Sequence, residues 1–288
     1  MRLLKAVAYR LAVVAATVVV GGLLSATLAR YAPGFGTDER QLDARLSSDS
    51  LQALRSTTSE ERNIVSYYTA SMGRMLKGDL GTSHSFQRPV RELLEERSAV
   101  TLRMIGAGLT AAWLASILLV MVAWLSGSKA FGTACTLGSG FLLCLPAGAV
   151  ALLLILVNGP GYVALAVVVL PKIYGYLSEL VAATARMPHL VTAKAKGLSE
   201  TNILLRHVAL VIRREVLALA GVSVALAIGA AIPVEALCGI PGVGQLAWQS
   251  ALARDLPVLI DVALVVIAFT VVANSGADFL SDEPGLAS

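Results

Sequence analysis

The sequence contains few charged residues. Only 15% of its 288 residues are Asp, Glu, Lys or Arg, whereas about 25% is usual for a soluble domain. Hydrophobic residues make up 56% of the chain, and its mean hydropathy is +0.74. This composition excludes an ordinary soluble protein and indicates a protein that crosses a membrane several times.

Cysteine and histidine are also scarce, with three residues of each. Cys135, Cys144 and Cys238 have no CxxC spacing and no clustered histidines, so we expect them to pack as small apolar side chains. The sequence lacks the phosphate loop GxxxxGK[ST], the HExxH motif and the GxSxG elbow. It therefore predicts no catalytic residue, no metal site and no cofactor site in this chain.

Positive charge is present, but it lies mainly at the ends of apolar runs. The net charge is +4 and the isoelectric point is about 9.1. Basic loops at membrane faces account for this charge, so we do not expect a nucleic-acid partner.

Apolar stretches long enough to cross about 30 Å of hydrocarbon predict the fold class. They lie near 9–30, 100–125, 133–157, 162–184, 215–237 and 257–280. We therefore predict an all-α polytopic membrane protein with about six transmembrane helices. The first stretch also has features of a secretory signal, but the spans that follow favour an uncleaved helix.

The basic residues in short loops predict the orientation. They precede the first span and recur in the loop 186–214, so both termini are expected in the cytoplasm. The predicted domains are a first transmembrane helix at 1–30, an extracytoplasmic loop or cap at 31–99 with a helical pattern over 57–72, and a core of five helices at 100–288.

Residues 188–210 form a basic stretch between two long apolar blocks. A loop between membrane helices needs few residues, so this length indicates folded structure. Gly197 can adopt a positive φ and end a short helix over 191–196. Ser199 can then cap a second helix that runs from Glu200 to about Arg213. An ordinary amphipathic loop lying on lipid headgroups is the alternative.

The run from Thr192 to Glu200, Thr-Ala-Lys-Ala-Lys-Gly-Leu-Ser-Glu, followed by Arg206-His207, resembles the cytoplasmic coupling loop of ABC importer permeases, in particular the peptide/nickel branch. The resemblance implies a type I importer permease fold. It also implies that a separate ATPase is contacted by Thr192, Ala193, Lys194, Ala195, Lys196, Gly197, Leu198, Ser199, Glu200, Arg206 and His207. Two departures are Val191, where the family often has an acidic residue, and a shorter stretch from Pro171 to Gly197.

Two further runs are similar to the same permeases. The first, Gly78 to Ser83 with Arg88-Pro89-Val90, corresponds to their approach to the second helix. The second lies between the last two helices and contains Glu235, Pro241, Gly242, Gly244, Arg254 and Asp255. The resemblance implies that this second run lines an outer gate or docks a binding protein, and a plain structural turn is the alternative.

Ionisable residues inside spans are costly and usually face a water-filled path or the interior of a bundle. Lys172 and Glu179, seven residues apart in one predicted span, are therefore candidates for the translocation path. Asp261 is expected near a membrane interface.

The predicted function is that of a permease subunit of an ATP-driven ABC importer in the bacterial inner membrane. The implied partners are ABC ATPase subunits that bind ATP and Mg²⁺, a second and different permease chain, an extracytoplasmic substrate-binding protein and the lipid bilayer. Peptide is the first expectation for the cargo, followed by nickel chelates or other small solutes. One alternative is a secondary carrier with Lys172, Glu179, Asp261 and Asp278 as relay groups, and another is a membrane scaffold without transport.

Overall fold

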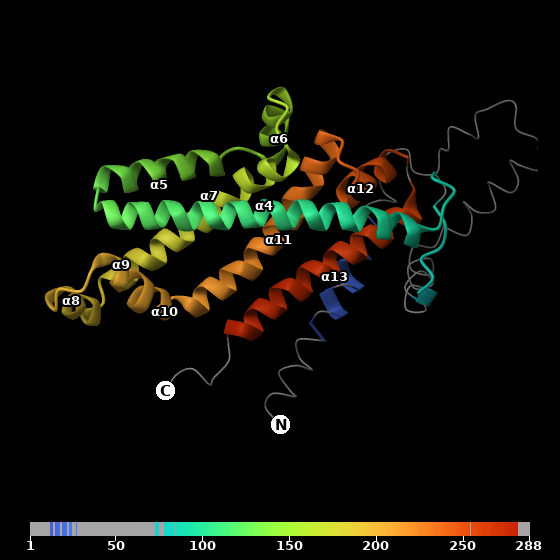
Figure 1. The fold of residues 1–288 in the computed structure, drawn as a ribbon. Coiled ribbons are helices and arrows are strands. Elements are labelled where there is room, and N and C mark those ends of the chain that lie inside the picture. The colour runs from blue at the N-terminus through green and yellow to red at the C-terminus, as the bar shows by residue number, and fades with distance from the viewer. Residues whose placement is uncertain are drawn as a thin grey trace, which may run out of the picture. The chain divides into compact units, whose positions relative to one another are not determined.

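In the residues that the computed structural model describes, helices are joined by turns and short irregular segments, and one isolated antiparallel bridge pairs Thr82 with Pro89 (Figure 1). The described residues are 12–13, 15–17, 19–21, 23–24, 27, 73–74, 78–83, 85–253 and 255–281. The all-α prediction is confirmed. The helices are α4 (Val90–Ser126), α5 (Lys129–Leu143), α6 (Ala147–Leu156), α7 (Gly161–Ala185), α8 (Pro188–Ala195), α9 (Glu200–Asn202), η2 (Ile203–Val208), α10 (Ala209–Val211), α11 (Arg213–Cys238), α12 (Val243–Leu252) and α13 (Leu256–Ser281).

The chain divides into two compact units. Unit 1 comprises Met1–Ser98 and Leu246–Phe269, and unit 2 comprises Ala99–Gln245 and Thr270–Ser288. The predicted division into 1–30, 31–99 and 100–288 stays a prediction, and its helical pattern over 57–72 lies outside the described residues.

Four helices in the described part of the chain are long and apolar enough to cross a membrane. They are α4, α7, α11 and the Pro257–Ser275 part of α13, and they match four of the predicted spans. The predicted first span, 9–30, lies largely outside the described residues, and those that are described there are helical.

The prediction of one continuous span over 133–157 is wrong. α5 and α6 replace it, and their axes are bent by 99° at the break between them. Pro146 stands just before α6 with an extended backbone, φ −61° and ψ 144°. Because proline has no backbone N–H and disfavours a helical residue before it, the helix ends here.

α7 is central to unit 2, where it packs against α5, α6 and α11. Its buried side chains include Leu165, Val169, Ile173 and Leu177. A small residue lets α4 approach closely, since a Cβ on Gly108 would lie 2.7 Å from Leu165 Cδ2. Close contacts at small residues are typical of helix packing inside membranes.

Serine hydroxyls also join these helices. Ser116 of α4 donates to the carbonyl of Leu170 at 3.3 Å, and Ser139 of α5 donates to the carbonyl of Pro171 at 3.0 Å. Both hydroxyls therefore reach α7 beside its internal proline, where the helical ladder loses one N–H donor.

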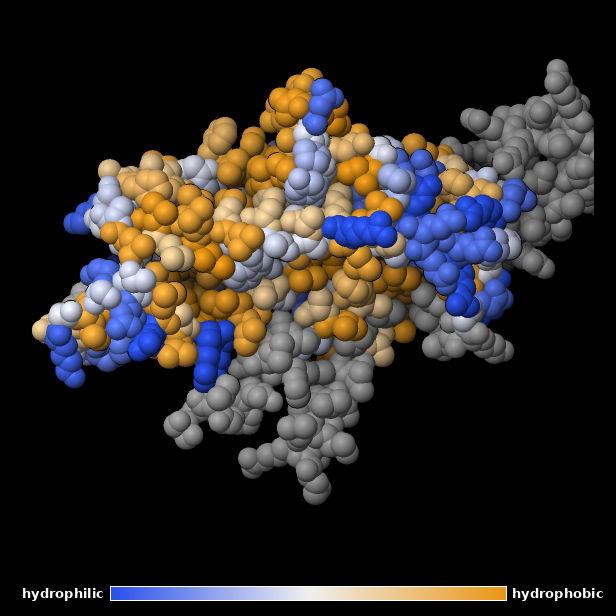
Figure 2. Space-filling view, in the orientation of Figure 1, coloured by the Kyte–Doolittle hydropathy of each residue, from blue (hydrophilic) through white to orange (hydrophobic). Residues whose placement is uncertain are grey.

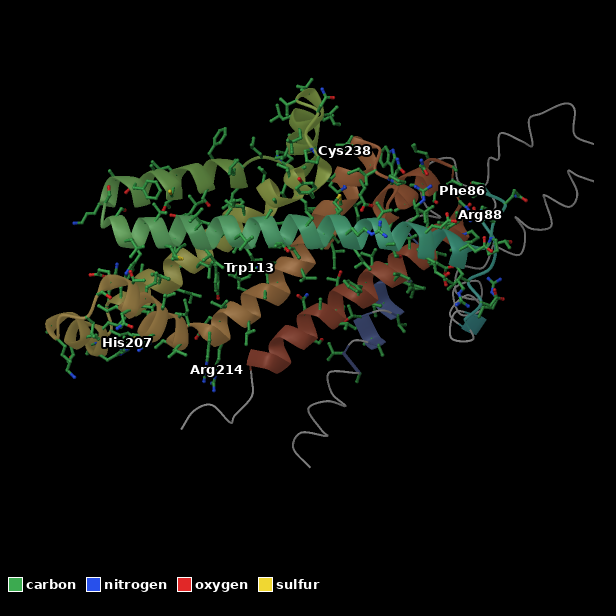
Figure 3. The ribbon with its side chains drawn as sticks, viewed as in Figure 1. Phe86, Arg88, Trp113, His207, Arg214 and Cys238 are labelled. Atoms are coloured by element: carbon green, nitrogen blue, oxygen red, sulfur yellow. The ribbon has the colours of Figure 1, made fainter. Side chains whose placement is uncertain are left out.

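Trp113 of α4 lies against α11, and its Nε1 donates to Ser223 Oγ at 3.1 Å (Figure 3). This bond gives α4 and α11 a direct polar contact. In unit 1, a Cβ on Gly21 would lie 2.8 Å from Ile267 Cδ1 of α13, so the first helix packs closely on α13.

Candidate functional site: a coupling segment and a clamped turn

Residues 186–214, here called the coupling segment, form a compact helical hairpin in unit 2. α8 ends at Ala195, and Gly197 follows with φ +76°. Ser199 caps the next helix, because its side chain accepts a hydrogen bond from Asn202 N at 3.4 Å. The predicted glycine turn and serine cap are confirmed. The first helix begins at Pro188, earlier than the predicted residue 191.

The second helix of the hairpin contains a turn of π-helix that the sequence did not predict. It runs over Ile203–Val208 between α9 and α10, and a break at Ile212 separates α10 from α11. π turns are rare in proteins as a whole, but those that do occur often lie at functional sites. Arg206 and His207 both lie in this turn.

Apolar side chains hold the hairpin together. Leu190 and Ala193 of α8 are buried, as are Ile203, Leu204 and Val208 of η2. α8 packs against η2, and both pack against α7. The hairpin therefore has its own small core and is anchored on the helix that precedes it.

The outer surface of the hairpin carries most of the predicted coupling residues. Figure 2 shows hydrophilic residues gathered at this end of unit 2, next to the hydrophobic surface of its spans. Ala193 is buried and His207 is partly buried, and the side chain of Lys194 lies outside the described set. The exposed residues are Thr192, Ala195, Lys196, Gly197, Leu198, Ser199, Glu200 and Arg206.

A second helix end is tied to the coupling segment. Trp124 Nε1, near the end of α4, donates to the backbone carbonyl of Glu200 at 3.2 Å. α4, α7 and α11 thus each contact or continue into this segment.

The turn after α11, residues 239–244 and here called the Pro-Gly turn, is folded tightly against that helix. Gly239 ends α11 in the left-handed region, with φ +65°. Glu235 is fully buried, and its Oε2 accepts a hydrogen bond from Gly244 N at 2.6 Å. A Cβ on Gly242 would overlap the Glu235 carboxylate, and one on Gly244 would lie 2.6 Å from Ile232 Cα. Both glycines are therefore required for this approach.

Two other helices contact the same turn. Val243 N donates to Thr101 Oγ1 of α4 at 2.8 Å. A Cβ on Gly161, at the start of α7, would overlap Ile240. Of the predicted gate residues, Glu235, Gly242 and Gly244 are brought together here, and Pro241 is exposed in the turn.

Asp255 makes a separate contact inside unit 1. It is 1% exposed, and its Oδ2 accepts from Ser83 Oγ at 2.5 Å and from Ser85 N at 2.9 Å. Two of the family-like runs, more than 160 residues apart in the chain, therefore meet at this carboxylate. Sequence reasoning singled out Asp255 but missed Ser85. Arg254 lies outside the described residues.

Ion pairs follow this contact at the start of α4. Exposed Arg88 donates to Glu96 Oε1 at 2.7 Å and to Glu92 Oε2 at 3.3 Å. These bonds raise the pKa of Arg88 above its usual value, with the bond to Glu96 contributing most. The pairs are solvent-exposed, so they contribute little to stability.

The candidate path residues are divided between the two units. Lys172 and Glu179 are both exposed on α7 in unit 2. Asp261 lies in unit 1 and is 5% exposed. The side chain of Asp278 lies outside the described set.

The long apolar helices are those of a protein that crosses a membrane several times. The chain belongs to the family described as "Binding-protein-dependent transport system inner membrane component", which matches residues 104–282, more than half of its length. It is also similar to the nickel import system permease proteins NikB of Staphylococcus aureus strains USA300, N315 and bovine RF122/ET3-1. Each is 26% identical to this chain over an alignment of 297 residues, gaps included. The alignment covers 98% of this chain and 90% of the relative.

These findings confirm the predicted role as a permease subunit of an ABC importer and a multi-pass inner-membrane location. They do not favour the secondary carrier or the scaffold. The assigned roles of individual site residues stay predictions.

Proposed function

We propose that this chain forms half of the translocation path of an ATP-driven importer and receives mechanical work through the coupling segment, residues 186–214. The observation that carries the proposal is the hairpin itself. It has a buried apolar core, an exposed surface with Lys196 and Arg206, and anchors on α7 and α11. A lever needs this combination of internal rigidity and two fixed attachments.

The energy source in this proposal is a separate ATPase subunit that binds ATP and Mg²⁺. The basic coupling segment would lie on the cytoplasmic side with both termini, in keeping with the positive charge in the short loops. A second permease chain, different from this one, would supply the other half of the path. A soluble binding protein would deliver the cargo from the opposite side, as the family description implies.

Nickel, as the ion or a chelate, is the first candidate for the cargo. The supporting observation is that the similar proteins are named as nickel import permeases. Peptide is the second candidate, because the runs around Gly197 and Pro241 resemble those of peptide permeases.

The first experiment is a pull-down of the tagged chain from its native membrane in mild detergent, followed by mass spectrometry. We expect a phosphate-loop ATPase and a second permease to be recovered with it. Reconstitution of that complex with its binding protein then allows uptake of ⁶³Ni²⁺ and of labelled dipeptide to be compared. A chain recovered alone, under conditions that preserve other membrane complexes, would contradict the proposal.

The matched control is a chain with Leu190→Asp, which places a charge in the apolar core of the hairpin. This variant should still enter the membrane, because the spans are unchanged. It should recover little ATPase. Equal recovery of ATPase by the variant and the parent chain would show that the hairpin is not the attachment.

A further inference from the structure

Glu235 is a buried carboxylate to which the coupling mechanism assigns no role. It lies in the last turn of α11 and has no exposed surface. Burying a carboxylate costs several kcal/mol unless hydrogen bonds compensate. Ionisable groups kept at such positions in membrane proteins usually serve function.

The surroundings of Glu235 show what the carboxylate does structurally. It accepts the hydrogen bond from Gly244 N and occupies the space that a Cβ on Gly242 would need. A second backbone bond, from Ile240 N to the carbonyl of Glu235 at 3.0 Å, closes the start of the turn. Side chain and backbone of one residue therefore hold both ends of the Pro-Gly turn.

This turn lies at the opposite end of α11 from the coupling segment (Figure 1). It contacts α4 through Thr101 and α7 through Gly161. α4, α7 and α11 are the same helices that contact or continue into the coupling segment. A movement of the hairpin would therefore be transmitted along three helices that all contact or lead into the one clamped turn.

We propose that Glu235 is a positioning residue for transport. Its carboxylate holds the Pro-Gly turn closed against α4, α7 and α11, so that this end of the path opens only when the coupling segment moves those helices. This inference rests on the proposed function and adds to it the residue that keeps the far end closed.

The test uses the complete reconstituted transporter with Glu235→Ala, Glu235→Gln and the control Glu92→Ala. Glutamine retains an oxygen that accepts the bond from Gly244 N, whereas alanine has no acceptor. Glu92 is an exposed carboxylate whose partner Arg88 keeps its bond to Glu96. Cargo uptake and ATP hydrolysis are measured together, since a merely structural defect lowers both in proportion.

The second readout is the reaction of Cys238 with a maleimide in detergent, with Cys135 and Cys144 replaced by serine. Cys238 is partly buried beside the turn, so its labelling rate reports opening without any assumption about orientation in the membrane. This readout does not need a transported cargo.

We expect Glu235→Ala to lower uptake per ATP and to raise the Cys238 labelling rate, each by about tenfold or more. A factor of ten corresponds to about 1.4 kcal/mol, the lower end of what a hydrogen bond to a charged group contributes. Glu235→Gln should stay within about threefold of the parent, and Glu92→Ala should match it.

Unchanged labelling in Glu235→Ala would overturn the proposal, as would a proportional loss of uptake and ATP hydrolysis. If that variant does not assemble, Thr101→Val removes the other side-chain anchor, and the same rise in labelling is expected. A parent complex without ATP-dependent uptake would refute the proposed function instead, while the labelling comparison still tests the clamp.

Discussion

Gly197 offers the most direct test of the coupling segment as a rigid lever. Its φ is +76°, and an added Cβ would have no atom within 4 Å. A substitution here therefore introduces no steric contact beyond its own backbone, and only the left-handed conformation opposes it. That conformation costs an ordinary residue about 1–2 kcal/mol. Asparagine tolerates it better, and β-branched valine tolerates it least.

Uptake per ATP hydrolysed is expected to be highest in the parent chain and to fall in the order Gly197→Asn, Gly197→Ala and Gly197→Val. At about 1.4 kcal/mol for each factor of ten, we expect alanine to lower the population of the native hairpin by about 5- to 30-fold relative to competing conformers. Valine should lower it further. Membrane insertion should persist in all variants, because the spans are untouched.

The assay is ATP-dependent uptake by proteoliposomes with ATP hydrolysis measured in the same sample. Gly138→Val is the matched control, since Gly138 lies in α5 without a positive φ and with no atom within 4 Å of an added Cβ. The reasoning is refuted if Gly197→Val couples as well as the parent, or if asparagine is as harmful as valine.

Three further variants test contacts on which the site depends. Asp255→Ala should lower the free energy of unfolding by about 2 kcal/mol, because Ser83 Oγ loses a charged acceptor, and a lower thermal unfolding midpoint in detergent should report it. Trp124→Phe should weaken the tie to Glu200 by about 1 kcal/mol, which faster hydrogen exchange at the start of α9 would show. Leu190→Ala should destabilise the hairpin core by about 2–5 kcal/mol, and trypsin should cleave the coupling segment faster.

Each of these variants has an outcome that would count against the structure. An unchanged midpoint in Asp255→Ala would mean that the buried carboxylate does not hold the Ser83 turn. Equal exchange rates in Trp124→Phe and the parent would remove the link between α4 and the hairpin. The control for Leu190→Ala is Leu205→Ala, which shortens an exposed side chain of the same segment and should leave the cleavage rate unchanged.

Local chemistry made part of the coupling segment predictable. A glycine that needs a positive φ and a serine that caps a helix are short-range signals, and both were found where the sequence indicated them. The π turn at Ile203–Val208 gave no such signal, because its composition suits an α-helix equally well.

Contacts between distant residues were beyond sequence reasoning. Asp255 and Ser83 stood out separately, but nothing in either run specifies that they are hydrogen-bonded. The same holds for Glu235 and Gly244, although the glycines of the Pro-Gly turn did indicate close backbone approach. Hydropathy also hid the break before Pro146, because an apolar run looks the same whether straight or bent. The proline itself was the available signal.

The bend at Pro146 also bears on how this segment enters the membrane and packs there. α5 has 15 residues and is about 22 Å long at 1.5 Å per residue, too short to cross the bilayer by itself. The insertion machinery selects segments by hydrophobicity, and α5 and α6 satisfy that criterion together, although their axes are bent by 99°. The packing of α6 against α7 and α11 needs helices that emerge from the ribosome later. The packing of α6 in unit 2 is therefore completed only after α11 has been made.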